Sequence, residues 1–215
     1  MRLRNNPQAK IFLKNNYQIV IQEPQTYQGN WSSKIFNNTQ PCHLEIGCGK
    51  GNFIIAMAHK YPMINFIAIE KSGVVLMVAV KKVVALEKIP NNLKFVQIDA
   101  NNILTIFAIN EITEIYLNFS DPWPKKKHYK RRLTHPKFLL AYKNILVNSG
   151  RILIRTDNAI LFDFTINSLR SDSNWKLLVQ EQDSLSSMFL TEYEKKFIKQ
   201  NKVIYYLKVV KNSFQ

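Results

Sequence analysis

The feature that most constrains the fold is an alternation of strand-like and helix-like segments along the 215 residues. Short apolar runs predict strands at His43–Ile46, Asn65–Glu70, Leu93–Asp99, Glu114–Phe119, Arg151–Thr156 and Val203–Val210. Longer segments between them predict helices at Asn52–His59, Ser72–Lys88, Pro136–Leu146 and Asn158–Leu169. This order is typical of an α/β fold, in which helices cover a largely parallel sheet.

Boundary signals support these elements. Ser72 is a plausible N-cap for the second helix, and Pro90 lies just past that helix's predicted end. The segment 148–150, Asn-Ser-Gly, predicts a turn between a helix and a strand. Residues 1–40 are polar with interspersed aromatics and predict an arm or cap packed on the domain. Residues 181–202 are polar and predict a loop.

Bulk composition predicts one globular domain spanning residues 1–215. The chain is 46% hydrophobic and 21% charged, and it is long enough to bury a full core. The sequence has no apolar run long enough to span a bilayer, and its basic N-terminus lacks the apolar stretch of a signal peptide. We therefore expect a cytoplasmic protein.

Cysteines and histidines give no metal-binding pattern. Cys42 and Cys48 are the only cysteines, and the four histidines are scattered without a known ligand spacing. We expect neither a disulfide framework nor a metal site, and we interpret both cysteines as small semi-buried residues.

The charge distribution points to an anionic partner. The net charge is +15, and six of the eight residues from Lys125 to Arg132 are Lys or Arg. Nucleotide bias in the gene could raise the lysine content, but it would spread the lysines evenly. Nucleic acid is the commonest partner of such a cluster. A membrane surface is a weaker hypothesis, because the segment has no long apolar helical face.

An acid and a tryptophan precede this cationic cluster. Asp121 and Trp123 lie in a segment stiffened by Pro122 and Pro124, directly after an apolar strand-like run. A single carboxylate beside an aromatic ring and a cationic strip suits a polyanion whose base is presented for chemistry. A nucleic-acid-modifying enzyme is therefore the first hypothesis.

Four predicted strands end on, or lead into, an acid: Glu70, Asp99, Asp121 and Asp157. In open α/β sheets, ligands bind outside the carboxyl ends of the strands. Taken singly, each acid is about as well explained as a helix N-cap. Together, the four favour a shared binding crevice.

A glycine-rich turn connects the first predicted strand to the first predicted helix. Gly47, Gly49 and Gly51 stand at alternate positions, a spacing that differs from both the dinucleotide fingerprint and the phosphate-binding P-loop. Glu70 follows Gly49 by 21 residues, where an acid can accept hydrogen bonds from ribose hydroxyls. Glu45 suits a ligand with an ammonium or sulfonium cation. The pattern therefore favours S-adenosylmethionine over NAD, with Asp99 near the adenine.

These segments resemble the bacterial tRNA (guanine-N7-)-methyltransferases, which are class I S-adenosylmethionine-dependent enzymes. The matching segments are Arg2–Asn5, Leu44–Gly51, Phe119–Lys126, His128–Leu133, Arg155–Asn158 and Thr191–Glu194. The resemblance implies a Rossmann-like, mostly parallel seven-stranded sheet with helices on both faces. It also implies methylation of N7 of a guanine in the variable loop of tRNA, at position 46.

The resemblance also assigns roles to residues. It makes Asp121 catalytic and places Glu45, Gly47, Gly49, Gly51, Glu70, Asp99 and Asp121 at the cofactor. The implied substrate and RNA contacts are Lys125, Lys127, His128, Tyr129, Lys130, Arg131, Arg132, Asp157, Thr191, Glu192, Tyr193 and Glu194. It implies no metal, and the oligomeric state, monomer or homodimer, stays open.

Two sequence features, Trp123 and the segment Thr191–Glu194, each have two possible interpretations. Trp123 is at least as well explained by packing that closes its loop as by stacking on the target base. The segment Thr191–Glu194 also fits a capping box at a helix start.

Two other functions remain open. The Asp121–Trp123 segment is similar to the short motif of exocyclic amino methyltransferases acting on adenine or cytosine, although Trp123 replaces that motif's second proline. A non-catalytic RNA-binding protein with a methyltransferase fold is the other alternative.

Overall fold

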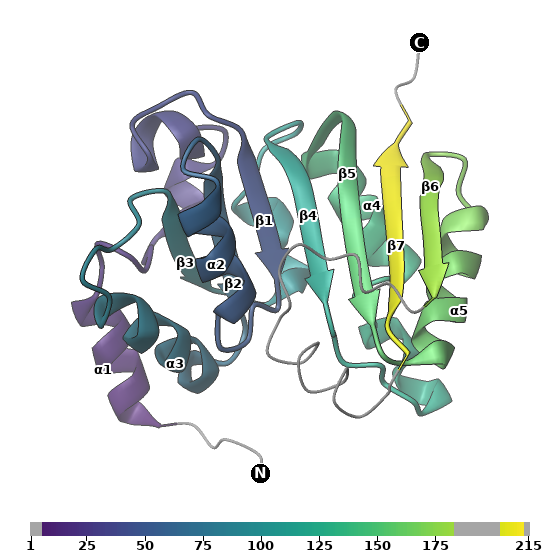
Figure 1. Cartoon of the computed structure of the whole chain (residues 1–215), viewed down its shortest axis with the longest axis horizontal. Helices are drawn as coiled ribbons and strands as arrows, with labels where there is room; N and C mark the ends of the chain where they lie inside the picture. Colours follow the sequence, from purple (N-terminus) through teal and green to yellow (C-terminus); the bar gives the residue numbers. More distant parts are fainter. Residues whose placement is uncertain (1–5, 183–202, 213–215) are drawn as a thin grey trace. The chain divides into compact units, whose positions relative to one another are not determined.

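The computed structural model describes residues 6–182 and 203–212, and the chain divides into two compact units, Met1–Ala108 and Ile109–Gln215. Figure 1 shows the helices and strands of each unit. They are called unit 1 and unit 2 below.

Unit 1 is built on three parallel strands in the order β3-β2-β1. Their bounds are β1 (Cys42–Ile46), β2 (Asn65–Glu70) and β3 (Leu93–Gln97). The connecting helices are α2 (Asn52–Lys60) and α3 (Gly73–Val84), and η3 (Ala100–Thr105) is a 3-10 turn after β3. All five residues of β1 are buried, as expected of a parallel strand covered on both faces.

The segment before β1 packs on the rest of unit 1. It contains α1 (Pro7–Asn15), η1 (Pro24–Tyr27) and η2 (Trp31–Ile35), and α1 contacts α3. The Phe95 amide donates to the Ile19 carbonyl at 2.8 Å, which adds a bridge beside β3. The indole of Trp31 is fully buried and donates to the Ile106 carbonyl at 2.8 Å.

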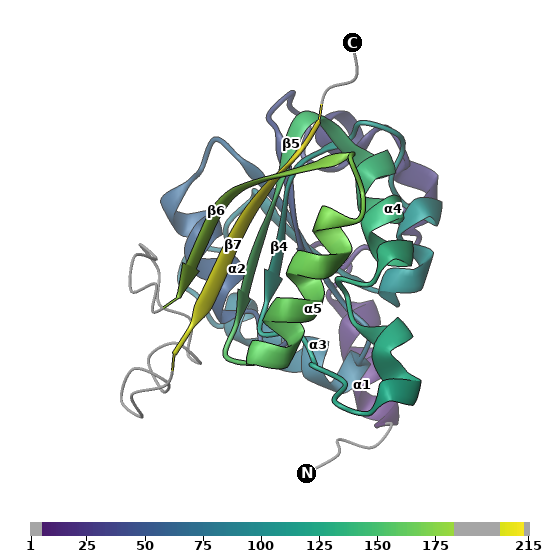
Figure 2. The same ribbon diagram turned by 90° about the vertical axis from the view of Figure 1, so that its right-hand side faces the viewer.

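Unit 2 is built on four strands in the order β4-β5-β7-β6. Their bounds are β4 (Ile112–Asn118), β5 (Leu146–Thr156), β6 (Trp175–Gln182) and β7 (Tyr205–Lys211). β4 and β5 are parallel, whereas β7 runs antiparallel to both β5 and β6. Helices α4 (Pro136–Ile145) and α5 (Ala159–Arg170) lie on the same side of these strands (Figure 2).

The six predicted strands and four predicted helices are all present; β2 has the predicted bounds, and the other elements have shifted ends. Ser72 caps α3 as predicted, since its hydroxyl accepts from the Val75 amide at 3.4 Å. However, α3 ends at Val84 rather than Lys88, and Ala85, Glu87 and Lys88 are exposed, so a longer helix would bury little more. α1 and β6 were not predicted from the sequence.

The turn predicted at 148–150 is also wrong in detail. These residues lie inside β5, where the pairing with β4 jumps from Ile112↔Leu146 to Glu114↔Arg151. Ser149 has φ of 60°, so the polar triplet forms an irregularity within the strand. The loop predicted at 181–202 begins instead with the last two residues of β6, and residues 183–202 lie outside the described part of the chain.

Candidate active site

The glycine-rich turn of unit 1 uses the left-handed backbone region at all three glycines. The φ angles of Gly47, Gly49 and Gly51 are 74°, 56° and 74°. A Cβ on Gly51 would lie 2.9 Å from the Cβ of Ala79 in α3, whereas a Cβ on Gly49 would meet nothing within 4 Å. Gly51 therefore allows close helix packing, and Gly49 leaves open space above the turn.

Glu70 ties this turn to the end of β2. Its two carboxylate oxygens accept from the Ser72 amide at 2.8 Å and from the Gly49 amide at 3.2 Å. Two backbone donors orient the carboxylate, and each oxygen keeps a second lone-pair direction.

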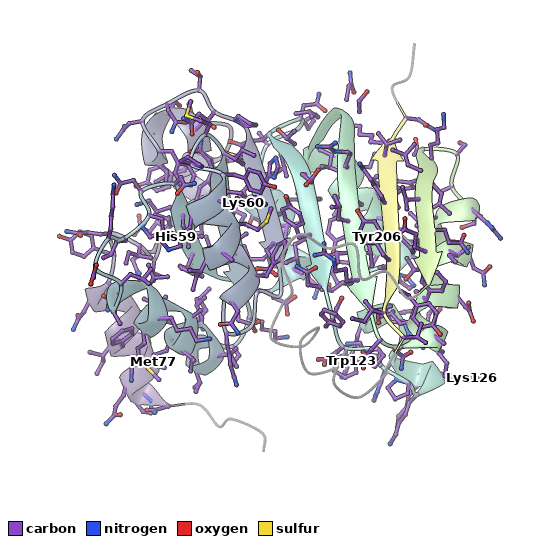
Figure 3. The ribbon with its side chains drawn as sticks, viewed as in Figure 1. His59, Lys60, Met77, Trp123, Lys126 and Tyr206 are labelled. Carbon is purple, nitrogen blue, oxygen red and sulfur yellow. The ribbon has the colours of Figure 1, made fainter. Side chains whose placement is uncertain are left out.

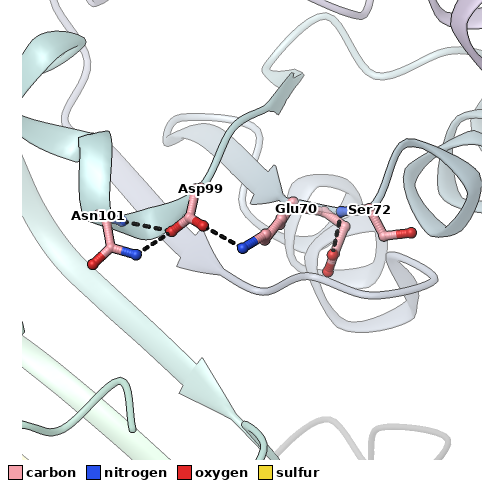
Figure 4. Close-up of polar contacts among 5 residues, drawn as sticks. Glu70, Ser72, Asp99 and Asn101 are labelled. Carbon is pink, nitrogen blue, oxygen red and sulfur yellow. Dashed lines mark hydrogen bonds and ion pairs between the residues drawn. The ribbon is translucent and has the colours of Figure 1, made fainter. Parts of the chain in front are cut away.

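Asp99, which caps η3, is fixed by a similar set of donors. One oxygen accepts from the Asn101 amide at 2.9 Å and from the Asn101 side chain at 2.6 Å, while the other forms a 2.6 Å ion pair with Lys71 (Figure 4). Partial burial raises the pKa of Asp99, but the Asn101 hydrogen bonds and Lys71 outweigh it, so the net pKa lies below the usual value. Asp99 is therefore an ionised acceptor.

The charges of Glu45 and Glu70 both affect the pKa of the Cys48 thiol. Burial, followed by the charges of Glu45 and Glu70, raises the pKa of Cys48 well above its usual value. Glu45 is itself buried, at 2% exposure, in β1. Unit 1 thus brings Glu45, Glu70 and the three glycines together, and Cys48 is a neutral residue that is buried rather than semi-buried as predicted.

In unit 2, Asp121 lies in an exposed turn after β4. Two non-glycine residues with positive φ flank it, Phe119 at 50° and Trp123 at 42°. The Phe119 amide donates to the Arg155 carbonyl at 2.8 Å, which ties the start of the turn to β5. Such a backbone persists only where its surroundings hold it, and it is common at functional sites.

Trp123 packs within its own segment. Its ring meets the His128 ring edge-on at 5.6 Å between centroids, and the Arg131 guanidinium lies 4.9 Å from the ring centroid. Figure 3 shows Trp123 and Lys126 beyond the carboxyl ends of β4 and β5. These contacts support the packing interpretation, and stacking of Trp123 on a base stays a prediction.

The cationic segment runs from Lys125 to Arg132, and its middle forms the 3-10 turn η4 (Lys126–Arg131). Five of its six cations are exposed: Lys125, Lys126, Lys127, Lys130 and Arg131. Arg132 differs, because it is only 6% exposed and its guanidinium donates to backbone carbonyls. Arg132 was predicted to be one of the RNA contacts, but its burial removes it from the exposed cationic surface.

The remaining predicted substrate contacts are less defined. Asp157 is half-buried after β5, next to Asn158, whose side chain caps α5 by accepting from the Leu161 amide at 2.9 Å. Thr191, Glu192, Tyr193 and Glu194 lie outside the described residues.

Among residues 6–182 and 203–212, no cluster of three or more His, Cys, Asp or Glu could hold a metal ion. No helix in these ranges is long and apolar enough to cross a membrane.

The residues that hold the acids in place were not predicted from the sequence. Lys71 and Asn101 anchor Asp99, and the Ser72 amide anchors Glu70. One signal was available, since Asn101 stands two residues after Asp99 at the distance of an Asx turn. Nothing local in the sequence marks Lys71 as a partner of Asp99, 28 positions along the chain.

Comparison with known proteins first defines the class. Residues 39–207 match a family described as "Putative methyltransferase". Similar solved structures include 16S rRNA methyltransferase KamB, with a TM-score of 0.64 at 11% identity, covering 86% of this chain and 94% of that one. A structure titled "Structure of an Antibiotic Related Methyltransferase" has a TM-score of 0.62 at 17% identity and covers 84% and 92%. The fold is therefore that of the class I methyltransferases, as predicted.

Curated relatives define the family. A tRNA (guanine-N(7)-)-methyltransferase of Brevibacillus brevis is 43% identical over 209 residues, covering 95% of this chain and 96% of the relative. The enzyme of the same name from Bacillus subtilis is 42% identical over 211 residues, covering 95% and 96%. The chain belongs to the tRNA (guanine-N7-)-methyltransferase family, which confirms the resemblance seen in the sequence.

Proposed function

We propose that the chain transfers a methyl group from S-adenosylmethionine to N7 of a guanine in tRNA, at position 46 of the variable loop. The observation that carries the proposal is the turn around Asp121, which is held in a costly backbone conformation and leads directly into five exposed cations. The relatives named above support the choice of tRNA and of guanine N7. An enzyme that modifies tRNA would work in the cytoplasm.

The residues of unit 1 fit the proposed cofactor. Open space above Gly49 admits a ligand close to the backbone, and the N-terminus of α2 offers amide donors to a carboxylate. The oriented carboxylate of Glu70 suits ribose hydroxyls, and the ionised Asp99 suits an adenine amino group. Glu45 would contribute negative charge toward a cationic ligand. S-adenosylmethionine supplies an electrophilic methyl group on a sulfonium ion.

Asp121 would act by charge rather than as a base. Guanine N7 carries a lone pair and needs no deprotonation before it attacks a methyl group. Methyl transfer leaves the guanine positively charged, so a nearby carboxylate stabilises the developing charge. The rest of catalysis is positioning, because nucleophile, methyl carbon and sulfur have to be collinear.

The exposed cations would hold the RNA. Lys125, Lys127, Lys130 and Arg131 are available for phosphates, with His128 and Tyr129 between them. Contacts from Asp157 and from Thr191–Glu194 remain part of the proposal. The target guanine has to leave its stack to be reached. We also propose that residues 1–215 act as a single methyltransferase domain, with residues 1–40 as its arm.

The decisive experiment incubates the protein with labelled S-adenosylmethionine and unmodified tRNA, then maps the modified nucleotide by mass spectrometry. We expect 7-methylguanosine in the variable loop. A methyl group on an exocyclic amine of adenine or cytosine would instead establish the amino-methyltransferase alternative. Retained tRNA binding, without methyl transfer and without a thermal shift on adding the cofactor, would establish a non-catalytic RNA-binding protein.

A further inference from the structure

Arg132 is buried at the edge of an otherwise exposed cationic segment. Its exposure is 6%, while Lys125, Lys126, Lys127, Lys130 and Arg131 are all exposed. A guanidinium is costly to bury unless its N–H groups are hydrogen-bonded. The hydrogen-bond acceptors of the Arg132 guanidinium therefore indicate its structural role.

Those partners belong to the turn that carries Asp121. The Arg132 Nε donates to the Pro122 carbonyl at 2.9 Å, and Nη2 donates to the Trp123 carbonyl at 3.3 Å. These are the two carbonyls that directly follow Asp121 in the chain. Trp123 has φ of 42°, a strained conformation that requires support from its surroundings. The planar guanidinium spans both carbonyls, which a lysine ammonium does not reproduce.

The other side of the guanidinium rests on α5. Its central carbon lies 4.5 Å from the centroid of the Phe164 ring. The rings of Tyr129 and His135 also contact Phe164, at 6.5 and 6.4 Å between centroids. The Thr165 hydroxyl donates to that of Thr134 at 2.8 Å. A packed helix thus fixes Arg132, and Arg132 fixes the backbone next to Asp121.

We propose that Arg132 is a positioning residue: it transmits the rigidity of α5 to the turn that presents Asp121, and it does not bind phosphate. This inference rests on the function proposed above. It predicts that Arg132 controls turnover, whereas its exposed neighbour Arg131 controls tRNA affinity.

The test compares Arg132→Lys with Arg131→Gln in steady-state methylation of tRNA. For Arg132→Lys we expect kcat to fall about 10- to 100-fold, the cost of a small misplacement, with KM for tRNA within about twofold of wild type. The salt dependence of tRNA binding should stay unchanged. For Arg131→Gln we expect KM for tRNA to rise and the salt slope to fall by about 0.7 to 0.9, because one phosphate contact is lost. Arg170→Gln, an exposed cation on α5, should change neither quantity.

A second variant guards against a folding defect. Phe164→Leu keeps an apolar side chain but removes the ring beneath Arg132, and it should lower kcat with no change in salt slope. A normal kcat in both Arg132→Lys and Phe164→Leu, or a flattened salt slope in Arg132→Lys, would overturn the proposal.

Tryptophan fluorescence separates this inference from the proposed function. Trp31 and Trp175 are 0% and 7% exposed, so Trp123 is the tryptophan most open to a change in quenching. In Arg132→Lys, acrylamide quenching should increase, and the increase should vanish when Trp123→Phe is added. If wild-type protein methylates no tRNA but this quenching change occurs, the proposed function fails and the structural role of Arg132 stands. Unchanged quenching contradicts that role.

Discussion

The acids of unit 1 and the acid of unit 2 are held by different kinds of contact. Glu70 and Asp99 both accept hydrogen bonds from backbone amides, those of Gly49, Ser72 and Asn101, and Asp99 has added support from the Lys71 and Asn101 side chains. One backbone hydrogen bond, from Phe119, ties the start of the turn carrying Asp121 to β5, but the carbonyls after Asp121 are held by a side chain, that of Arg132. A backbone-held site is sensitive to changes that alter the course of the chain. A turn held by a side chain is sensitive to single side-chain substitutions.

The strongest test of this comparison concerns Asp121. Replacing it by asparagine keeps the shape of the side chain and removes the charge, so we expect kcat to fall about 10²- to 10³-fold, as when a transition-state contact is lost. Cofactor affinity should change far less. Single-turnover methylation and cofactor titration measure the two effects. Asp163→Asn, on the exposed face of α5, is the matched control, and a wild-type rate in folded Asp121→Asn would contradict the role of the charge.

The next largest effects come from replacing two glycines of the same turn, Gly51 and Gly49, by alanine. Gly51→Ala introduces a Cβ 2.9 Å from that of Ala79 and strains a left-handed residue, so we expect a loss of about 2–4 kcal/mol in unfolding free energy. Gly49→Ala carries only the backbone cost, about 1–2 kcal/mol, but it fills the open space. It should weaken cofactor binding more than its stability loss explains. Urea denaturation and calorimetric titration check both values, and equal stability losses would show that the close contact with Ala79 relaxes.

The contribution of the cationic segment to tRNA affinity should depend on the salt concentration, because it comes from charge. Neutralising Lys126 and Lys127 to glutamine removes two exposed charges, so the slope of log affinity for tRNA against log salt should fall by about 1.5. The loss of affinity should be similar for different tRNAs. Binding measured over a range of salt concentrations gives the slope. The paired control is Arg170→Gln with Lys176→Gln, and an unchanged slope in the Lys126 and Lys127 variant would exclude these lysines from the RNA surface.

The smallest effect is a pH dependence of stability. His135 caps α4 by accepting from the Lys137 amide at 3.2 Å, and burial, with Lys137 and Lys130, lowers its pKa below 6.5. The folded state therefore binds a proton less readily than the unfolded state. Stability should be full above pH 6.5 and decrease as the pH falls below it. His135→Asn keeps a capping acceptor that does not titrate.

Thermal melts at pH 7.5 and 5.5 measure this dependence. The wild type should lose more stability between the two values than His135→Asn, by an amount on the order of a lost N-cap, about 0.5–1 kcal/mol. An equal loss in both proteins would show that other groups cause the pH response.

The sequence predicted the elements whose signals are local. Strands such as Asn65–Glu70 are continuous apolar runs, and Ser72 marks the start of α3. β6 escaped prediction because only Trp175 is buried in it, its other residues up to Glu181 are intermediate or exposed, and its partner β7 is distant in sequence. The ends of elements depend on packing that a local pattern does not contain, as the early end of α3 shows.

The same distinction applies to the candidate site. The glycine turn was recognisable from its spacing along the chain, and its three glycines adopt the left-handed backbone region. The contacts of these glycines and of Glu70 with a cofactor stay predictions. The different position of Arg132 was not predictable, because six cations in eight residues look alike and the ring that selects one of them, Phe164, stands 32 positions later.

The left-handed conformations of Phe119 and Trp123 have a consequence for engineering. Glycine or asparagine would adopt these angles at lower cost than an aromatic residue. Selection for thermal stability alone should therefore favour glycine or asparagine at both positions. The resulting proteins would melt at higher temperature and turn over more slowly, a trade-off between durability and activity located in a single loop.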